Sequence, residues 1–450
     1  MTLDPTTARA LTQRLAVEQA THRLPSVVAG FVRAGELVWS GAAGTLDGSA
    51  AGEAPSNDTQ YRMGSISKTF VAVEVLRLRD EGLLDLAQTI GTHLPEVPFG
   101  HVTIAQLLTH TSGLQAETDG DWWERAPGAA WDELITSGIG LRFTPGTAFH
   151  YSNTGYGVLG ELVTRVRGVA WIDAVRDGIL APLGMTRTTT RPVAPAAPGL
   201  AVHPLADLLH VEPEHDAVSM SPAGQLWSTV GDLGRWAAFL AGDTAGVLST
   251  ESLREMLRPV AVNDVPGTAW TGAHGLGWQT WNVEGRRYAG HGGSMPGFLA
   301  NLRVEVESGD GVVVMANATS GLGPVAGELL DLVRTQDPVA PTPWHRDAAQ
   351  AELVDLVGPW FWGTYASTLT LEADGGFRLG EPGQGRGARF RRDGDRWVGL
   401  EGYYRGEPLV VERDASGVPS RLVLASFVFT RTPYAEGVEI PGGHDTQGWH

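Results

Sequence analysis

Hydrophobic and polar positions follow two different rhythms along the first 335 residues. Apolar residues at helical spacing predict a helix over residues 7–21, and dense apolar stretches at 27–33 and 36–40 predict two strands joined in a hairpin. From residue 65 to about residue 257 the pattern is helical and rich in loops. Strand patterns then return at residues 275–282, 287–289, 300–306 and 311–316. Strands at both ends that enclose helices predict an α+β fold, with one antiparallel sheet covered by helices.

A proline-rich segment separates this region from a second one of different character. Residues 336–345 hold three prolines, and a short helical piece follows them. Short strands punctuated by turns, such as those at 374–376 and 393–395, then predict a small closed antiparallel barrel. The expected organisation is therefore a first domain over 1–335, a linker over 336–350, a barrel over 351–435 and a C-terminal tail over 436–450.

Composition restricts the functions that remain open. The chain has 450 residues, 42% of them apolar, and a formal net charge of −18 without long acidic runs. Nucleic acid and anionic membranes attract basic patches, so neither is expected as a partner. The absence of cysteine excludes disulfides, thiolate nucleophiles and cysteine-ligated metals. The sequence starts without a basic and apolar leader pattern, and a cytoplasmic protein is expected.

One lysine, Lys68, stands in a chain whose other basic residues are 32 arginines and the histidines. Arginine cannot lose its proton near neutral pH, whereas an amine can, so this exception predicts a proton carrier. Lys68 lies three residues after Ser65, ahead of a helix predicted over 71–86, and residues three apart share a helix face. The helix dipole should lower the pKa of an amine in the first turn and make it a general base beside a nucleophile. The competing interpretation is a serine N-cap followed by an exposed lysine.

Two further motifs supply groups that acyl transfer requires. Tyr151-x-Asn153 lies in a turn ahead of a helix predicted over 158–166, where a phenol can point into a cleft. His291-x-Gly293 follows a predicted strand, and its glycines would allow a substrate backbone to approach closely.

Together these motifs resemble those of the serine β-lactamase and penicillin-binding-protein superfamily, in its class C-like branch with a C-terminal lipocalin-like domain. Supporting stretches at 108–114, 223–229 and 275–278 are similar to that branch and occur in the same order. The resemblance covers about the first three-quarters of the chain. No Gly-x-Ser-x-Gly surrounds any serine, which argues against an α/β-hydrolase.

The resemblance implies a role for each motif. Ser65 would form an acyl-enzyme, Lys68 would take its proton, and Tyr151 would pass protons to and from the leaving or incoming group. Asn153 would orient the substrate amide or Lys68. The backbone N–H groups of Ser65 and Ser294 would form the oxyanion hole, and Gly292 and Gly293 would lie along the substrate.

The third motif departs from the common Lys-Thr-Gly, whose lysine meets the substrate carboxylate. Here His291 stands in that place, so efficient β-lactam hydrolysis is not expected. A histidine at this position is similar to what D-aminopeptidases, family VIII esterases and stand-alone penicillin-binding-protein-type thioesterases carry. The alternative is a histidine that only forms a hydrogen bond between strands.

Two more side chains are candidates for substrate contact. Trp227 either lines the substrate cleft or belongs to the core. Arg431, in the last strand of the barrel, either holds a peptide carboxylate or forms an ion pair at the barrel rim. The histidines at 203, 210 and 215 share an acidic loop, but their spacing fits no zinc pattern, and neither a metal nor a cofactor is expected.

Three functions follow from the resemblance. The leading hypothesis is a thioesterase that takes a nonribosomal peptidyl thioester, with a carrier protein as partner, and releases a macrocycle with a D-residue near the acylating end. The second is hydrolysis of D-amino-acid amides, D-peptides or esters, ahead of a DD-carboxypeptidase or a β-lactamase. The third is a catalytically silent binding protein, which the lysine beside Ser65 disfavours.

Overall fold

The computed structural model describes residues 2–381, 384–435, 438–440, 443, 445 and 447. Contacts within the chain divide it into two units, Met1–Val339 and Ala340–His450. Most of the C-terminal tail expected over 436–450 lies outside the described residues. Within the described part of the chain, no helix is both long and apolar enough to span a bilayer.

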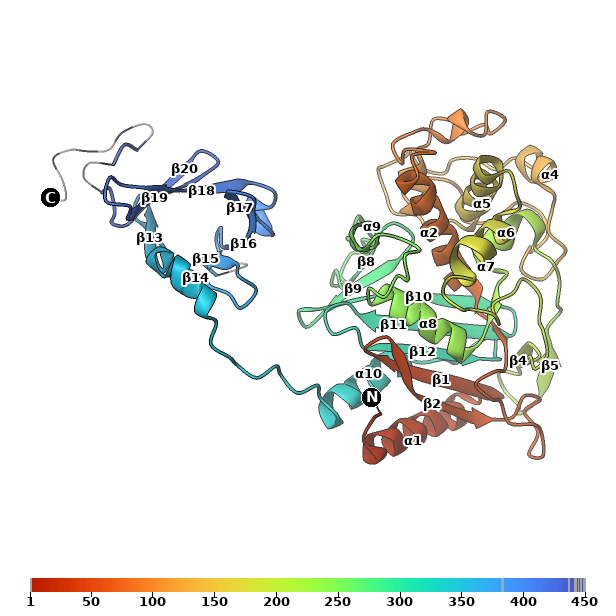
Figure 1. Cartoon of the computed structure of the whole chain (residues 1–450). Coiled ribbons are helices and arrows are strands. Elements are labelled where there is room, and N and C mark those ends of the chain that lie inside the picture. The colour runs from red at the N-terminus through yellow and green to blue at the C-terminus, as the bar shows by residue number, and fades with distance from the viewer. Residues whose placement is uncertain are drawn as a thin grey trace. The chain divides into compact units, whose positions relative to one another are not determined.

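The first unit is built on an eight-stranded antiparallel sheet with the order β2-β1-β12-β11-β10-β9-β8-β7. Its first and last long strands, β1 and β12, pair with each other, with Ala29 opposite Val314, so segments from both ends of the unit meet near the β2 edge of the sheet (Figure 1). The strands of this sheet are β1 (Ser26–Arg33), β2 (Glu36–Gly44), β7 (Ala261–Val262), β8 (Gly272–His274), β9 (Gln279–Val283), β10 (Arg286–Met295), β11 (Phe298–Glu305) and β12 (Gly311–Ala316). The predicted α+β fold is confirmed.

Helices cover both faces of this sheet, which explains why β1 and β12 are buried along their whole length. In β1, Val27 and Phe31 pack in a cluster with α1 and α10, whereas Val28 and Val32 join the large core of the helical region. Figure 1 shows α1 and α10 on one face and α8 on the other. The helices of the unit are α1 (Pro5–His22), α2 (Ser67–Asp80), α3 (Ile104–Leu108), α4 (Trp131–Thr136), α5 (Asn153–Arg167), α6 (Trp171–Val175), α7 (Ser221–Gly224), α8 (Val230–Leu240), α9 (Thr250–Met256) and α10 (Val325–Gln336), with short turns η1 (Gly64–Ile66), η2 (Ile90–Thr92), η3 (Arg176–Leu180) and η4 (Val218–Met220).

Several element boundaries differ from the sequence-based expectations. The strand predicted over 287–289 extends as β10 to Met295, so His291 and Gly293 lie within this strand and not after it. The helix predicted over 71–86 ends at Asp80, because Gly82 adopts a left-handed φ of 73°. The strand predicted over 275–282 begins only at Gln279, as β9, because residues 275–278 form a turn in which Gly277 has a φ of 84°. The helix predicted from 158 begins at Asn153, because the Ser152 hydroxyl caps it by accepting the Gly155 N–H at 3.0 Å.

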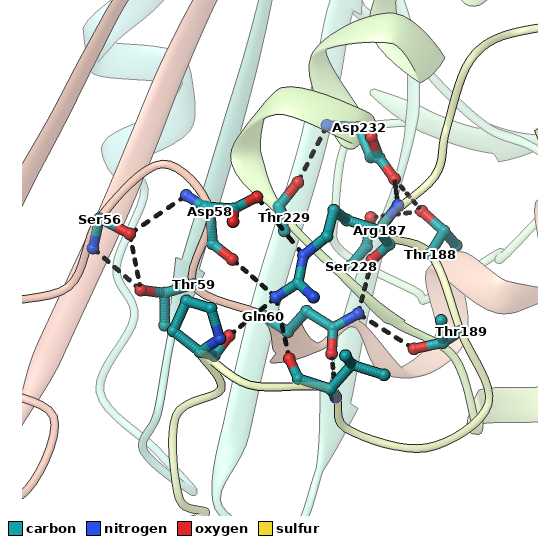
Figure 2. Close-up of polar contacts among 12 residues, drawn as sticks. Ser56, Asp58, Thr59, Gln60, Arg187, Thr188, Thr189, Ser228, Thr229 and Asp232 are labelled. Carbon is teal, nitrogen blue, oxygen red and sulfur yellow. Dashed lines mark hydrogen bonds and ion pairs between the residues drawn. The ribbon is translucent and has the colours of Figure 1, made fainter.

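A small ladder of β3 (Tyr61–Arg62) and β6 (Trp227–Ser228) leads into the segment that carries Ser65. Side chains fix this ladder in place (Figure 2). The Gln60 side chain donates to the Arg187 carbonyl at 2.7 Å, and the Thr188 hydroxyl contacts the Ser228 hydroxyl at 2.9 Å. A second small ladder joins β4 (Leu200–Val202) and β5 (Leu209–Val211).

The second unit contains a closed antiparallel barrel whose strands follow chain order, as the sequence predicts. The last strand returns to the first, with Thr430 opposite Phe361. Alternate residues fill the interior, among them Trp360, Leu369 and Phe390. Its elements are η5 (Ala348–Leu356), β13 (Gly358–Trp362), β14 (Tyr365–Leu371), β15 (Phe377–Leu379), β16 (Ala388–Asp393), β17 (Arg396–Gly399), η6 (Gly402–Tyr404), β18 (Pro408–Arg413), β19 (Pro419–Leu424) and β20 (Phe427–Thr430).

The buried carboxylate of Asp232 ties the loop before β4 to α8 and yields a stability prediction. It accepts the Arg187 N–H at 2.8 Å and the Thr188 hydroxyl at 2.9 Å (Figure 2). Replacing Asp232 by Ala should lower the free energy of unfolding by about 2–4 kcal/mol, because two buried donors lose their acceptor. Urea denaturation of both proteins measures this change. The exposed Asp243→Ala should change the free energy by less than about 0.5 kcal/mol, and an equal effect of both variants would contradict the argument.

Candidate active site

The hydroxyl of Ser65 is presented by a tight turn at the start of α2. Ser65 lies in η1 and is half-buried, and Gly64 before it has a left-handed φ of 54°. A Cβ on Gly64 would lie 2.5 Å from the backbone nitrogen of Ser294 on β10. Both the backbone conformation and the contact with β10 therefore require glycine at this position.

The Lys68 side chain is completely buried and points back to Ser65. Its Nζ lies 2.8 Å from the Ser65 Oγ and donates to the Ala223 carbonyl at 2.6 Å. Burial lowers the pKa of Lys68 to about 7, and the negative charges of Glu117 and Glu124 oppose this shift. The interpretation of Lys68 as an exposed residue was wrong. The expected pKa direction holds, but its cause is desolvation rather than the helix dipole.

Tyr151 lies on the other side of the Ser65 hydroxyl. The two hydroxyls are hydrogen-bonded, and Lys68 Nζ lies 5.1 Å from the centre of the Tyr151 ring. Burial raises the pKa of Tyr151 above its ordinary value, so this residue is a neutral phenol at neutral pH. Of the two groups beside Ser65, Lys68 is therefore the one that is able to accept a proton.

Three histidines surround Tyr151, and sequence analysis singled out only one of them. The His110 ring stacks on Tyr151 with 4.2 Å between the ring centres, and His274 lies 6.0 Å from the same ring. Burial lowers the pKa of His274 to about 4 and that of His110 well below its ordinary value. His110 Nδ1 also accepts the Ser152 N–H at 3.0 Å, which fixes the segment next to Tyr151. The phenol thus lies among neutral rings.

His291 occupies β10 opposite Leu302, with its ring 6.3 Å from that of Tyr151. Its Nδ1 lies 2.5 Å from the Gly292 carbonyl, which can only accept, so Nδ1 carries the proton. Burial, together with the charge of Lys68, lowers the pKa of His291 to about 3. A neutral imidazole therefore stands at the third motif.

Asn153 is held by a residue that the sequence patterns did not reveal. Its Nδ2 donates to Glu117 Oε1 at 2.6 Å, and Trp123 Nε1 donates to the other oxygen of Glu117 at 2.7 Å. The Asn153 Oδ1 is buried, and no partner for it exists among the described residues. This oxygen is positioned to accept an N–H from outside the chain. Glu117 lies in an irregular loop without periodicity, so only its tertiary contacts identify it.

The strand β10 comes very close to the nucleophile turn. A Cβ on Gly293 would lie 1.9 Å from the Met63 carbonyl oxygen and 3.3 Å from the Ser65 nitrogen. Gly292 is anchored from the neighbouring strand, since its N–H donates to Gln279 Oε1 at 3.1 Å. The backbone of Ser294, which is exposed, therefore borders Ser65, as an oxyanion hole would require.

The two remaining candidates lie in different surroundings. Trp227 is 3% exposed on β6 and packs edge-on against Phe298 at 4.9 Å, where it lines a cavity. Arg431 is engaged by its own barrel: its guanidinium lies 3.8 Å from the Trp360 ring and donates to carbonyls that include those of Asp355 and Val357. One interpretation of Arg431 was an ion pair at the barrel rim. Among the described residues, Arg431 forms no ion pair. Contact of either residue with substrate stays a prediction.

The arrangement contains the parts that acyl transfer needs. A hydroxyl contacts an amine with a pKa of about 7 and a neutral phenol, while the backbone of β10 passes close to the turn that carries this hydroxyl. An amine in this state removes the hydroxyl proton as oxygen attacks a carbonyl, and backbone N–H groups stabilise the oxyanion that forms.

Comparisons with known proteins agree with this geometry. Residues 8–334 match the family model described as Beta-lactamase, and residues 349–431 match a domain of unknown function (DUF7586). Penicillin-binding protein 4 of Amycolatopsis lactamdurans is 31% identical over 304 residues, which are 63% of this chain and 77% of that protein.

Solved structures extend the comparison. A D-stereospecific amidohydrolase from Streptomyces sp. is 26% identical, with a TM-score of 0.62 over 74% of this chain and 99% of that one. The octameric penicillin-binding protein homologue from Pyrococcus abyssi aligns with 94% of this chain and 99% of its own at a TM-score of 0.64, and its 22% identity shows the fold alone.

The family model covers the whole of the sheet and its helices, including the segments that carry Ser65, Tyr151 and His291. The chain therefore belongs to the β-lactamase and penicillin-binding-protein family of serine hydrolases, which act through an acyl-enzyme.

Proposed function

We propose that this chain hydrolyses amides or small peptides of D-amino acids through an acyl-enzyme on Ser65. The observation that carries the proposal is the buried amine of Lys68, which lies 2.8 Å from the Ser65 hydroxyl with a pKa of about 7. The D-configuration rests on the similarity to the D-stereospecific amidohydrolase.

In the acylation step, Ser65 Oγ attacks the amide carbonyl while the neutral Lys68 amine takes the hydroxyl proton. The N–H groups of Ser65 and Ser294 stabilise the oxyanion. The carbon–nitrogen bond then breaks, and the leaving amine receives its proton from the Tyr151 phenol, which Lys68 reprotonates. An ester on Ser65 and a free amine result, and Lys68 is neutral again.

Water completes the cycle by the reverse proton path. As the water oxygen attacks the ester, Tyr151 accepts a proton from the water and passes its own proton to the neutral Lys68 amine. Lys68 then returns a proton to Ser65 Oγ as the ester bond breaks, and Ser65 leaves as the hydroxyl. Asn153 assists both steps, since its unpartnered Oδ1 can accept the N–H of the substrate backbone. The products are a carboxylic acid and the free enzyme.

The third motif supports an amide substrate over a β-lactam. His291 is uncharged at neutral pH, because its pKa is about 3, so it offers no cation to a carboxylate on the leaving-group side. Transfer of a peptidyl thioester to an internal amine, with release of a macrocycle, uses the same acyl-enzyme. That leading hypothesis from the sequence stays a prediction, as does the carrier-protein partner, and product analysis distinguishes it from hydrolysis.

Replacing Lys68 by Arg keeps the charge but removes the accessible pKa. Acylation of Ser65 by an activated D-amino-acid ester should fall by about 10²–10⁴-fold, the usual contribution of a general base. Mass spectrometry of the intact protein at timed intervals measures the adduct, and circular dichroism shows that the variant is folded. A variant that acylates at nearly the wild-type rate would exclude Lys68 as the base.

The pH dependence of acylation follows from the lowered pKa of Lys68, about 7. Protonated lysine has no lone pair, so the acylation rate should increase about tenfold per pH unit below that value and level off above it. Single-turnover acylation measured from pH 5 to pH 9 tests this. A rate that is constant across the range, or that rises only above pH 9, would contradict a buried neutral amine.

Product analysis tests the substrate class. The protein is incubated with matched D- and L-amino-acid amides, and with D-terminated peptidyl thioesters that carry a free amino end. We expect the D-amides to be hydrolysed at least about tenfold faster than the L-amides, and linear acids to form from the thioesters. A cyclic product would instead establish transfer to an amine, and equal rates for both enantiomers would remove the D-specific part of the proposal.

A further inference from the structure

A cavity of about 770 Å³ lies beside the segment that leads to Ser65. Arg62 on β3, Trp227 on β6 and Phe298 on β11 line it from inside, where each is at most 3% exposed. Residues 196–199 and 210–214 form its walls, and the latter are largely exposed. The cavity therefore combines a buried aromatic and cationic floor with a polar rim.

Two hydrogen-bond donors on this floor have no acceptor among the described residues. The Arg62 Nη2 donates to Gln225 Oε1 at 2.8 Å, but its Nε is buried without a partner. The buried Nε1 of Trp227 is also without a partner. Buried polar groups are almost always hydrogen-bonded, so two unused N–H groups in one cavity indicate a ligand that carries acceptor oxygens.

The charge of Arg62 is also uncompensated at short range. No carboxylate of the described residues lies within ion-pair distance of it, although its pKa of about 10 keeps it charged. By contrast, the buried Arg33 at the end of β1 forms two hydrogen bonds with Asp310, at 2.7 and 3.0 Å. A buried guanidinium normally has such a partner, because an unpaired charge is costly away from water.

Most of the acidic side chains near Arg62 or in the wall of the cavity already interact with another side chain. Glu124 accepts the Trp122 indole N–H at 3.0 Å, Asp216 pairs with Arg191 at 2.8 Å, and Glu212 pairs with Arg125 at 2.9 Å. Glu214 lies at the exposed rim. None of these carboxylates forms an ion pair with Arg62 among the described residues, although the charges of Glu124, Glu214 and Asp216 act on it from further away, so its guanidinium can still bind an external anion.

The cavity wall is held in position before any ligand arrives. The Gln60 side chain accepts the Val193 N–H at 2.6 Å, and its carbonyl accepts the Ala197 N–H at 2.9 Å. Arg187 donates to the carbonyls of Val193 and Pro195 at 2.8 and 3.1 Å, and Figure 2 shows this side chain between the loop and β3. A preorganised wall reduces the entropic cost of binding.

Each floor residue extends from a segment that also builds the active site. Arg62 precedes Ser65 by three residues, and Trp227 follows Ala223, the acceptor of the Lys68 amine, by four. Phe298 begins β11 directly after the turn that follows Ser294. These short separations along the chain connect the floor of the cavity to the segments that hold Ser65, the acceptor of Lys68 and Ser294.

We propose that this cavity binds a carboxylate of the substrate, with the Arg62 guanidinium and the Trp227 indole N–H as donors. The inference rests on the proposed function and deepens it: the preferred substrates are D-amino-acid amides or peptides that carry a negative charge. The source of this carboxylate is a side chain or the C-terminus of a peptide.

A binding experiment tests the cavity without catalysis. Ser65→Ala protein is titrated with glutarate and with its neutral diamide in a calorimeter. Glutarate should bind at least about tenfold more tightly, as expected for a charge-assisted pair, and Arg62→Met should remove this difference. Arg303→Met is the matched control. Arg303 is also a partly buried arginine whose Nε has no partner among the described residues, but its guanidinium lies over the Trp281 and Tyr288 rings and does not line the cavity.

A second variant and a turnover assay complete the test. Trp227→Phe removes the indole N–H while it keeps an aromatic side chain, and it should weaken glutarate binding about threefold or more. This variant keeps the proposal testable if Arg62→Met does not fold. The turnover assay compares two pairs of substrates that differ in one carboxylate. D-Isoglutamine and D-glutamic acid diamide differ in the side-chain carboxylate, whereas D-alanyl-D-alanine and its amide differ in the C-terminal carboxylate. We expect kcat/KM to favour one charged member at least about tenfold.

The outcomes separate this inference from the proposed function. Two results would overturn the carboxylate site even if D-amides are hydrolysed. One is equal affinity for glutarate and its diamide, and the other is an equal loss of glutarate affinity in Arg62→Met and Arg303→Met. Carboxylate binding that depends on Arg62 in a protein that turns over no amide would support the cavity and reject the hydrolase.

Discussion

The burial of one amine is the constraint on which the active site depends. Lys68 is completely enclosed, and water is replaced around its Nζ by the Ser65 hydroxyl and the Ala223 carbonyl. Desolvation brings its pKa to about 7, a value at which the amine exists in both states near neutral pH. An arginine in this place would remain charged, which explains why a chain that otherwise uses arginine keeps a lysine here.

Enclosing this amine requires several elements to meet within a small volume. The turn before α2 contacts β10 so closely that Gly64 and Gly293 have no room for a side chain. The ladder of β3 and β6 holds the other end of this turn, and the buried Asp232 network anchors that ladder (Figure 2). The position of Ser65 is thus determined by contacts among segments more than 150 residues apart in the sequence.

Charge is distributed unevenly around the site. The rings that surround Tyr151 are neutral histidines, since burial lowers their pKa values, and His291 lacks the charge that a lysine would supply on β10. The buried cation Arg62 lies instead on β3, three residues before Ser65, where it lines a cavity together with Trp227. Recognition of a substrate charge in this chain would therefore occur away from the third motif.

The sequence by itself determined the fold class, the family resemblance and the residues of the three motifs. Ser65 and Lys68 could be paired because they are three residues apart, and the apolar strands could be recognised because both sheet faces are covered. Local breaks at Gly82 and Gly277 were missed, since a left-handed glycine leaves no trace in a hydrophobic pattern. Only the tertiary structure revealed Glu117, His110 and Arg62, which act through contacts with distant segments. It also decided the cause of the Lys68 pKa shift, because desolvation depends on everything packed around the amine and not on its place in the helix.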